Sequence, residues 1–429
     1  MILFLLWITL ITYVIFSYFT FRKNLLSPSL IVGVVYFFSC TICILECRKW
    51  GFILDVKTYF LILLSLIIVF IGDFFASKLK PFVKEKPNKK ELSIDNFFLF
   101  IGFLIVTITF VLFLIETVRL SLLYYGTTDR LLENIKYIIL EGNYNINYLV
   151  QHLYTLSEVI VSVFIFYILY CKIKKKYFIR NVFIYIAIVL FIFNVIITAT
   201  RSKVINLFIY TFVISMFLSY TEKKEFRKKN VNKIFEIFIP SFMVFLILFC
   251  IAGSLTGKSS EYNNIWDNIT NYTASSLYNF NDYVVNKRFY KESPFFGAYT
   301  FSGIYSLLRE LGMQIPNDII ALEYNKVWNF TSNIYTPLRR YYQDFGIIGL
   351  CIILFTISFF YKTIIKNVKS HNLLYTMLIS FFIYPLFYFS IEERFFMDVI
   401  CMRSIYQVIY FIIIYNVFFK IKVFNRRVN

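Results

Sequence analysis

Long apolar runs constrain the fold of this chain more than any other feature of its sequence. A helix that crosses a bilayer needs about 20 mostly apolar residues, and with 59% hydrophobic residues the 429-residue chain is far more apolar than a soluble domain. The sequence therefore predicts an all-α, polytopic integral membrane protein with about 11 transmembrane helices. The predicted spans are 1–21, 29–46, 58–76, 96–117, 148–170, 182–200, 203–220, 236–256, 346–361, 373–391 and 399–419.

Basic residues predict how these spans are oriented. The formal charge of +19 would suggest nucleic-acid binding in a soluble protein, but here the basic residues fall in short clusters between apolar runs. Such clusters mark the cytoplasmic side of membrane proteins. We therefore expect the amino terminus outside, the carboxyl terminus inside, a lipid bilayer as surroundings and no nucleic-acid partner. The clusters lie at 22–23, 78–90, 172–180, 223–233, 362–369 and 420–427.

This topology places two long segments on the outer face and divides the chain into three parts. Residues 1–256 form the first eight spans, with an amphipathic outer helix expected near 128–140, where apolar residues recur at helical spacing. Residues 257–345 form a large outer loop, too long for a mere connection. Residues 346–429 hold the last three spans and a cytoplasmic tail.

The outer loop is rich in Tyr, Phe, Trp and Asn. Flat aromatic faces beside amides and hydroxyls suit a sugar, which presents both apolar C–H faces and many hydroxyls. The alternative is an aromatic belt at the membrane surface together with a small aromatic core.

Cations at the outer membrane edge point to an anionic ligand. Arg201 and Lys203 lie in a tight outer hairpin, where the positive-inside trend disfavours them. Arg339 and Arg340 lie a few residues before the ninth span, and the guanidinium fork suits phosphate or carboxylate. The alternative is that these side chains only reach up to lipid head groups.

Motifs of soluble enzymes are missing from the sequence, including nucleotide-binding loops and nucleophile elbows. Two histidines, His152 and His371, are too few for a histidine metal centre, and the cysteines lack zinc-site spacing. We therefore expect no cofactor and no metal. The energy for any reaction must then lie in the substrate, and a lipid-diphosphate sugar meets that need because its diphosphate is the leaving group.

Three stretches carry a resemblance to a known family. Ala199-Thr-Arg-Ser-Lys-Val-Ile205 and Asn333-Ile-Tyr-Thr-Pro-Leu-Arg-Arg-Tyr-Tyr-Gln-Asp-Phe-Gly346 resemble segments of the bacterial O-antigen and capsule repeat-unit polymerases, the Wzy-type family. The stretch Ser293 to Gly312 is similar to the middle of the family's large outer loop. The resemblance implies a membrane glycosyltransferase that joins undecaprenyl-diphosphate-linked oligosaccharide repeat units on the outer face of a bacterial inner membrane. It also implies a chain-length regulator protein as a partner.

The resemblance also implies roles for individual residues. Arg201 would bind the donor diphosphate, and Arg339 or Arg340 the same group or the diphosphate of the acceptor. Asp344 would orient an arginine or receive the proton of the attacking sugar hydroxyl; alternatively, it anchors the turn into the ninth span. Arg201, Arg339 and Asp344 are the expected catalytic residues. The expected substrate-binding residues are Lys203, Arg309, Glu310, Tyr335 and Arg340.

Two other functions stay open at this point. An O-antigen ligase would share the architecture, but that family resemblance implies a functional histidine in the outer loop, and 257–345 contains none. A flippase or other transporter would be expected to show pseudo-symmetric halves and charged residues near the midplane. The spans hold almost no charge, although Asp73 and Glu116 lie near span ends.

Overall fold

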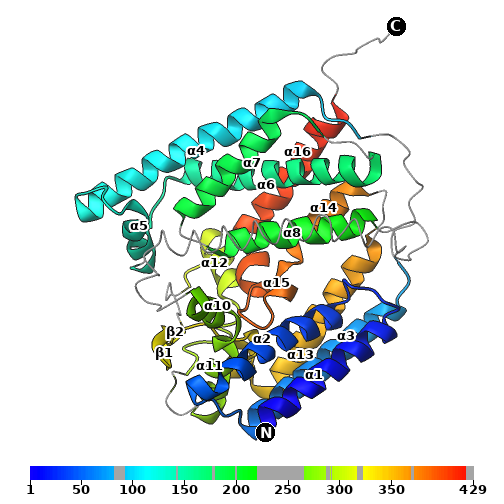
Figure 1. Ribbon diagram of the computed structural model, residues 1–429. Coiled ribbons are helices and arrows are strands. Elements are labelled where there is room, and N and C mark those ends of the chain that lie inside the picture. The colour runs from blue at the N-terminus through cyan, green and yellow to red at the C-terminus, as the bar shows by residue number, and fades with distance from the viewer. Residues whose placement is uncertain are drawn as a thin grey trace. The chain divides into compact units, whose positions relative to one another are not determined.

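The regular structure of the described residues is helical apart from one small hairpin (Figure 1). Within the residues that the structure describes, eight helices are long and apolar enough to cross a membrane. This confirms an all-α chain of the multi-pass membrane type. These helices are α1 (Ile2–Thr20), α2 (Pro28–Trp50), α3 (Val56–Lys78), α4 (Asn96–Tyr125), α6 (Tyr148–Tyr170), α8 (Arg201–Ser219), α13 (Pro337–Asn367) and α16 (Met402–Lys420). The computed structural model describes residues 1–81, 92–141, 144–175, 179–198, 201–219, 265–286, 290, 292–315, 322–368 and 372–421.

Two further predicted spans correspond to shorter helices. The run 182–200 forms α7 (Val182–Ile197), which has 16 residues. The run 373–391 is interrupted at Ile383, between α14 (Leu373–Phe382) and α15 (Tyr384–Phe387), where Pro385 opens the new helix. The run 236–256 lies outside the described residues, so the total of eleven spans stays a prediction.

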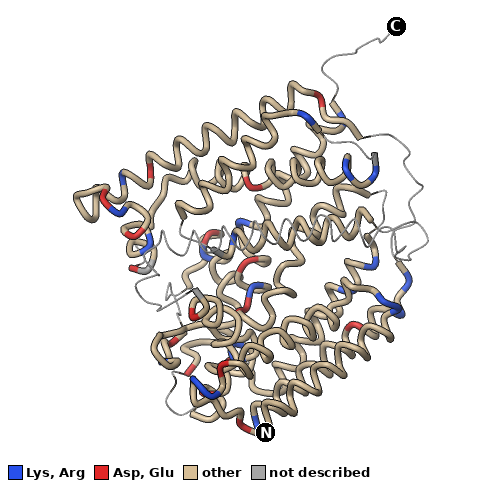
Figure 2. The backbone as a smooth tube through the Cα atoms, in the orientation of Figure 1, with Lys and Arg blue, Asp and Glu red and all other residues tan. Residues whose placement is uncertain are grey.

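The chain divides into two compact units, each built from three stretches of sequence. The first unit comprises residues 1–84, 262–367 and 382–404, and the second comprises 85–261, 368–381 and 405–429. Charged residues fall mainly near helix ends and in connections, and most of the helical backbone carries none, as Figure 2 shows.

In the first unit, α1, α2, α3 and α13 lie side by side (Figure 1). Small residues allow α3 and α13 to approach closely, as is common between membrane helices. A Cβ atom on Gly72 would lie 2.7 Å from the backbone oxygen of Phe355. Ser358 donates a hydrogen bond of 2.6 Å to the carbonyl oxygen of Val69. This contact fixes the part of α13 that follows Gly346.

A buried ion pair joins the same two helices. Asp73 in α3 and Lys362 in α13 are both buried, with 2.8 Å between carboxylate Oδ1 and Nζ. The other carboxylate oxygen of Asp73 accepts hydrogen bonds from the hydroxyls of Ser27 and Ser29, at 2.5 and 2.6 Å, and from the Ser29 N–H at 3.0 Å. The carboxylate therefore also caps the start of α2. Lys362 was predicted to belong to a cytoplasmic basic cluster, whereas its side chain is buried against Asp73 and Ser27.

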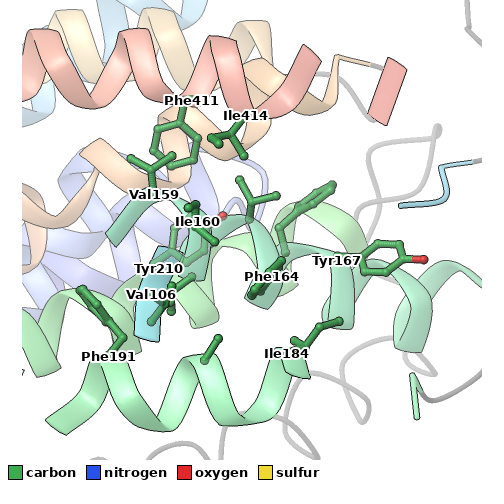
Figure 3. Close-up of a cluster of buried hydrophobic side chains, with 14 of the residues drawn as sticks. Val106, Val159, Ile160, Phe164, Tyr167, Ile184, Phe191, Tyr210, Phe411 and Ile414 are labelled. Atoms are coloured by element: carbon green, nitrogen blue, oxygen red, sulfur yellow. The ribbon is translucent and has the colours of Figure 1, made fainter. Parts of the chain in front are cut away.

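The second unit packs α4, α6, α7, α8, α14 and α16 around a continuous apolar core, part of which Figure 3 shows. Val106, Ile160, Phe164, Phe191 and Phe411 are among its fully buried members. The helix expected near 128–140 is α5 (Leu131–Leu140), which buries Ile135 and Ile138 in this core; its place on the outer face stays a prediction. A π-helical turn (Cys171–Lys175) extends α6.

Helix α13 begins earlier than its hydropathy indicates. Its first turns, from Pro337, precede the predicted span 346–361 and contain both arginines of the expected site. Gly346 breaks the helix with φ 64° and ψ −160°, a backbone conformation that is essentially restricted to glycine. The residues predicted to lie in a loop-to-helix junction therefore form a short helix of their own, set off from the apolar part by this break.

Candidate functional site

The described part of 257–345 is folded rather than extended. It contains α10 (Ile265–Thr273), α11 (Ser275–Val285), α12 (Ser302–Glu310) and an antiparallel hairpin of β1 (Asn325–Val327) and β2 (Phe330–Ser332). Buried asparagines tie these elements together. Asn279 donates to the carbonyl oxygen of Ile334 at 2.8 Å, and Asn281 accepts from the N–H of Asp55 at 2.8 Å. These two amides therefore support the fold, whereas the sequence offered them as sugar ligands.

Arg339 lies at the centre of an aromatic cage in this segment. Its side chain is fully buried, with 0% exposed. The guanidinium carbon lies 3.9 Å from the ring centre of Tyr335, 4.7 Å from that of Tyr283 and 4.8 Å from that of Tyr290. Three ring faces attract the cation and fix its orientation. The structure thus brings together Arg339 and Tyr335, two of the residues expected to form the site.

One carboxylate pairs with this cation, and two of the three guanidinium nitrogens have no acceptor among the described residues. Nη2 of Arg339 donates to Oε2 of Glu323, just before β1. Neither Nε nor Nη1 has a hydrogen-bond partner among the described residues. Buried donors without acceptors are costly and rare. A fork of this kind is the group that binds phosphate oxygens through several bonds at once.

A polar network holds the walls of the cage. The hydroxyl of Tyr335 donates to the backbone oxygen of Glu323 at 3.1 Å. The hydroxyl of Tyr290 donates to Oδ2 of Asp282, and the amide of Asn325 donates to the same oxygen at 3.1 Å. Burial raises the pKa of the Tyr335 phenol to about 12 and also raises that of Tyr290. Both hydroxyls therefore stay neutral at physiological pH.

The sequence around Tyr290 carries further basic residues. They are Lys287, Arg288 and Lys291, which lie outside the described residues.

Arg340 and Asp344 hold a neighbouring segment instead of the cage. Nη1 of Arg340 donates to the backbone oxygen of Tyr299 at 2.9 Å. Asp344 accepts from the N–H of Thr300 at 2.7 Å and from the hydroxyl of Ser293 at 2.6 Å. Both side chains thus fasten the stretch 293–300 to the first turns of α13. This geometry agrees with the anchoring alternative for Asp344, and its catalytic role stays a prediction.

Arg309 and Glu310 occupy the last turn of α12, with Glu310 exposed. Gly303, near the start of this helix, packs directly on the π-helical turn Phe395–Val399, because a Cβ there would lie 2.1 Å from the backbone oxygen of Phe396. The substrate-binding roles of Arg309 and Glu310 stay predictions.

Arg201 and Lys203 belong to the second unit. Arg201 is the first residue of α8. Lys203 pairs with Glu158 of α6, with 3.0 Å between Nζ and Oε1, and the amide of Gln407 donates to the other carboxylate oxygen at 2.8 Å. Glu158 is buried. The lysine expected to bind substrate is therefore bound by a carboxylate of its own unit, and the role of Arg201 stays a prediction.

Two carboxylates of the first unit, the half-buried Glu323 and the buried Glu393, were not identified from the sequence. Glu323 is sixteen positions before Arg339 in the sequence, with nothing in the intervening residues to mark the pairing. Glu393 accepts hydrogen bonds from the hydroxyl of Tyr341 at 3.1 Å and from the N–H groups of Phe396 and Met397 at 2.8 and 3.1 Å. Burial raises the pKa of Glu393 to about 7.

No protein-family model, no curated protein and no solved structure matches the chain. The site is therefore interpreted from its own geometry: a buried, oriented guanidinium with unused donors, next to a helix that leads into a membrane-length apolar segment.

Proposed function

We propose that the chain is a membrane glycosyltransferase that uses a glycan donor linked to a lipid diphosphate. One observation carries the proposal: the caged guanidinium of Arg339 has two nitrogens, Nε and Nη1, without an acceptor among the described residues. Oxygens of a diphosphate would satisfy these donors, and a cation at the leaving oxygens stabilises the negative charge that develops there during transfer. The apolar helices would hold the lipid.

The particular reaction proposed is the polymerisation of undecaprenyl-diphosphate-linked repeat units into O-antigen or capsular polysaccharide. It would take place on the outer face of a bacterial inner membrane, with a chain-length regulator as partner. The support is the resemblance of 199–205, 293–312 and 333–346 to the repeat-unit polymerases, together with the position of Arg339 in one of those stretches. The role of Arg201 in binding a donor diphosphate rests on the resemblance of 199–205 alone.

The first test is a gel of the surface glycan from the source bacterium after deletion of the gene. Loss of the long-chain ladder, with one repeat unit still attached to its acceptor, would establish a polymerase. A bare acceptor with long chains left on the carrier lipid would establish a ligase instead. An unchanged ladder would rule out both reactions.

The site is tested in the complemented strain with Arg339→Ala and Arg201→Ala. Each is expected to abolish long chains while the amount of protein in the membrane stays unchanged. Lys326→Ala is the matched control, because this exposed lysine lies in β1 of the same segment, and it should leave the ladder intact. Normal chain lengths in both arginine variants would overturn the assignment of the site.

A transporter is a second proposal, and the buried ion pairs favour it. Ionisable groups inside membrane helices often belong to transport pathways, and Asp73 with Lys362 and Glu158 with Lys203 are two such pairs. The expectation of almost uncharged spans was therefore too simple. A flippase would leave repeat units on the inner leaflet when the gene is deleted, whereas a polymerase would leave single units on the outer leaflet, as labelling with a membrane-impermeant lectin can distinguish.

A further inference from the structure

Glu323 occupies the place that an anionic ligand of Arg339 would take. Its carboxylate makes the one ion pair of this guanidinium among the described residues. We propose that Glu323 is an internal substitute for the ligand, and that a diphosphate group binds Arg339 by displacing this carboxylate. The proposal rests on the proposed function, because it takes the caged guanidinium to be the anion site.

Burial indicates which partner of the pair can move. The Arg339 side chain is 0% exposed and is enclosed by three rings, whereas 27% of the Glu323 side chain is exposed. An arginine held by stacked rings has few alternative rotamers. The carboxylate already reaches solvent, where water can replace its bond to the guanidinium. In this exchange of the carboxylate for a diphosphate, Glu323 therefore moves and Arg339 stays in place.

The backbone near Glu323 is held without the ion pair. Tyr335 binds the backbone oxygen of Glu323 at 3.1 Å. Two positions later, the amide of Asn325 binds Asp282 at 3.1 Å and the hydroxyl of Tyr290 at 2.7 Å. These bonds hold the backbone at and after Glu323 through groups other than its carboxylate, so this backbone can stay in position when the carboxylate leaves.

Charge explains why the carboxylate must leave for an anion to bind. Among the described residues, the network contains the guanidinium of Arg339 and the carboxylates of Glu323 and Asp282, so a diphosphate bound beside Arg339 would lie close to the negative charge of Glu323. Like charges at such short range repel strongly. When Glu323 swings out, Nη2 becomes available in addition to Nε and Nη1, and adjacent nitrogens of this planar group can donate side by side to a ligand. Several phosphate oxygens can then bind at once.

The proposal is tested with the full-length protein in detergent micelles, by titration calorimetry with inorganic pyrophosphate. Glu323→Gln keeps the volume of the side chain and removes its charge, and we expect it to bind pyrophosphate roughly tenfold or more tightly than the wild type. Glu323→Ala, which also removes the acceptor, should bind at least as tightly as Glu323→Gln. The matched control is Glu292→Gln, an exposed carboxylate of the same segment, which should bind as the wild type does.

A third variant separates this proposal from the proposed function. Arg339→Gln should abolish binding of the probe. If it does, and Glu323→Gln binds no better than the wild type, the exchange is refuted while the anion site stands. If Arg339→Gln binds as the wild type does, the site itself is refuted. Weaker binding by Glu323→Gln would make the carboxylate a support for Arg339 and would also refute the exchange.

The same titration with undecaprenyl diphosphate distinguishes the two sources of the ligand. A gain in Glu323→Gln with both compounds would show displacement by the diphosphate group itself. A gain with the lipid alone would show displacement that requires the lipid-linked form. Either result supports the exchange, and equal affinities of the variant and the wild type for both compounds would refute it.

Discussion

Breaking the buried pair of Asp73 and Lys362 should destabilise the first unit strongly. Removing one partner of a buried ion pair leaves an uncompensated charge and costs about 3–5 kcal/mol. The loss of stability in Lys362→Met should lie near the low end of this range, because Asp73 keeps its three hydrogen bonds from Ser27 and Ser29. The loss in Asp73→Asn should lie near the high end. Among the contacts described, the Lys362 ammonium then keeps only the Ser27 hydroxyl at 3.0 Å and the ring of Phe21, whose centre is 4.3 Å away.

The double variant Asp73→Asn with Lys362→Met removes both charges together. We expect its loss of stability to be smaller than the sum of the single losses by about 3 kcal/mol or more, because neither charge is then left alone. Unfolding by sodium dodecyl sulfate in mixed micelles, followed by tryptophan fluorescence, measures these differences. The matched control is the pair Arg130 and Glu133, where 80% and 33% of the side chains are exposed; breaking it should cost less than about 1 kcal/mol. Additive losses in the buried pair, or single losses below about 1 kcal/mol, would refute the reasoning.

Three further predictions concern single residues. Arg339→Lys keeps the charge but loses the planar fork and its stacking on Tyr335, so long-chain glycan on the gel should fall roughly tenfold or more; a normal ladder would mean that charge alone suffices. Glu393→Gln should remove a pH-dependent loss of stability. Since the folded pKa of about 7 lies above the ordinary glutamate pKa of 4.5, wild-type stability should fall by up to about 3 kcal/mol as pH rises from 4.5 through 7, and equal pH profiles of thermal unfolding would contradict this. Gly346→Ala should cost about 1–3 kcal/mol, because alanine disfavours φ 64° with ψ −160°; an unchanged unfolding midpoint would contradict it.

The membrane helices were predictable because one property, apolar length, both defines them and is visible in the sequence. Polar turns at the ends of such helices are harder to predict from the sequence. Residues 337–345 form a helix, yet they carry two arginines and an aspartate, so a search for apolar runs misses them. The break between α14 and α15 was also missed, although Pro385 is the kind of residue that marks a new helix start.

The partners of the charged residues were the least predictable part. Tyr335 precedes Arg339 by only four residues but lies before the start of α13 at Pro337, so helical spacing does not predict their contact. Tyr283 and Glu323 reach the same guanidinium from α11 and from the start of the hairpin, and such contacts depend on the tertiary fold. Asp73 was noticed as unusual in the sequence, but its partner Lys362 lies 289 positions further on.

The division of each unit among three stretches of chain has a consequence for synthesis in the cell. The core of the second unit receives Phe411 and Phe418 from α16, and buried Glu158 receives its bond from Gln407. These residues leave the ribosome last, after the whole of 262–404 has been made. Until then, the surfaces of this unit's earlier helices that α16 later covers have no packing partner. We expect the newly inserted chain to depend on membrane chaperones during this interval, and a truncation before α16 to be degraded quickly.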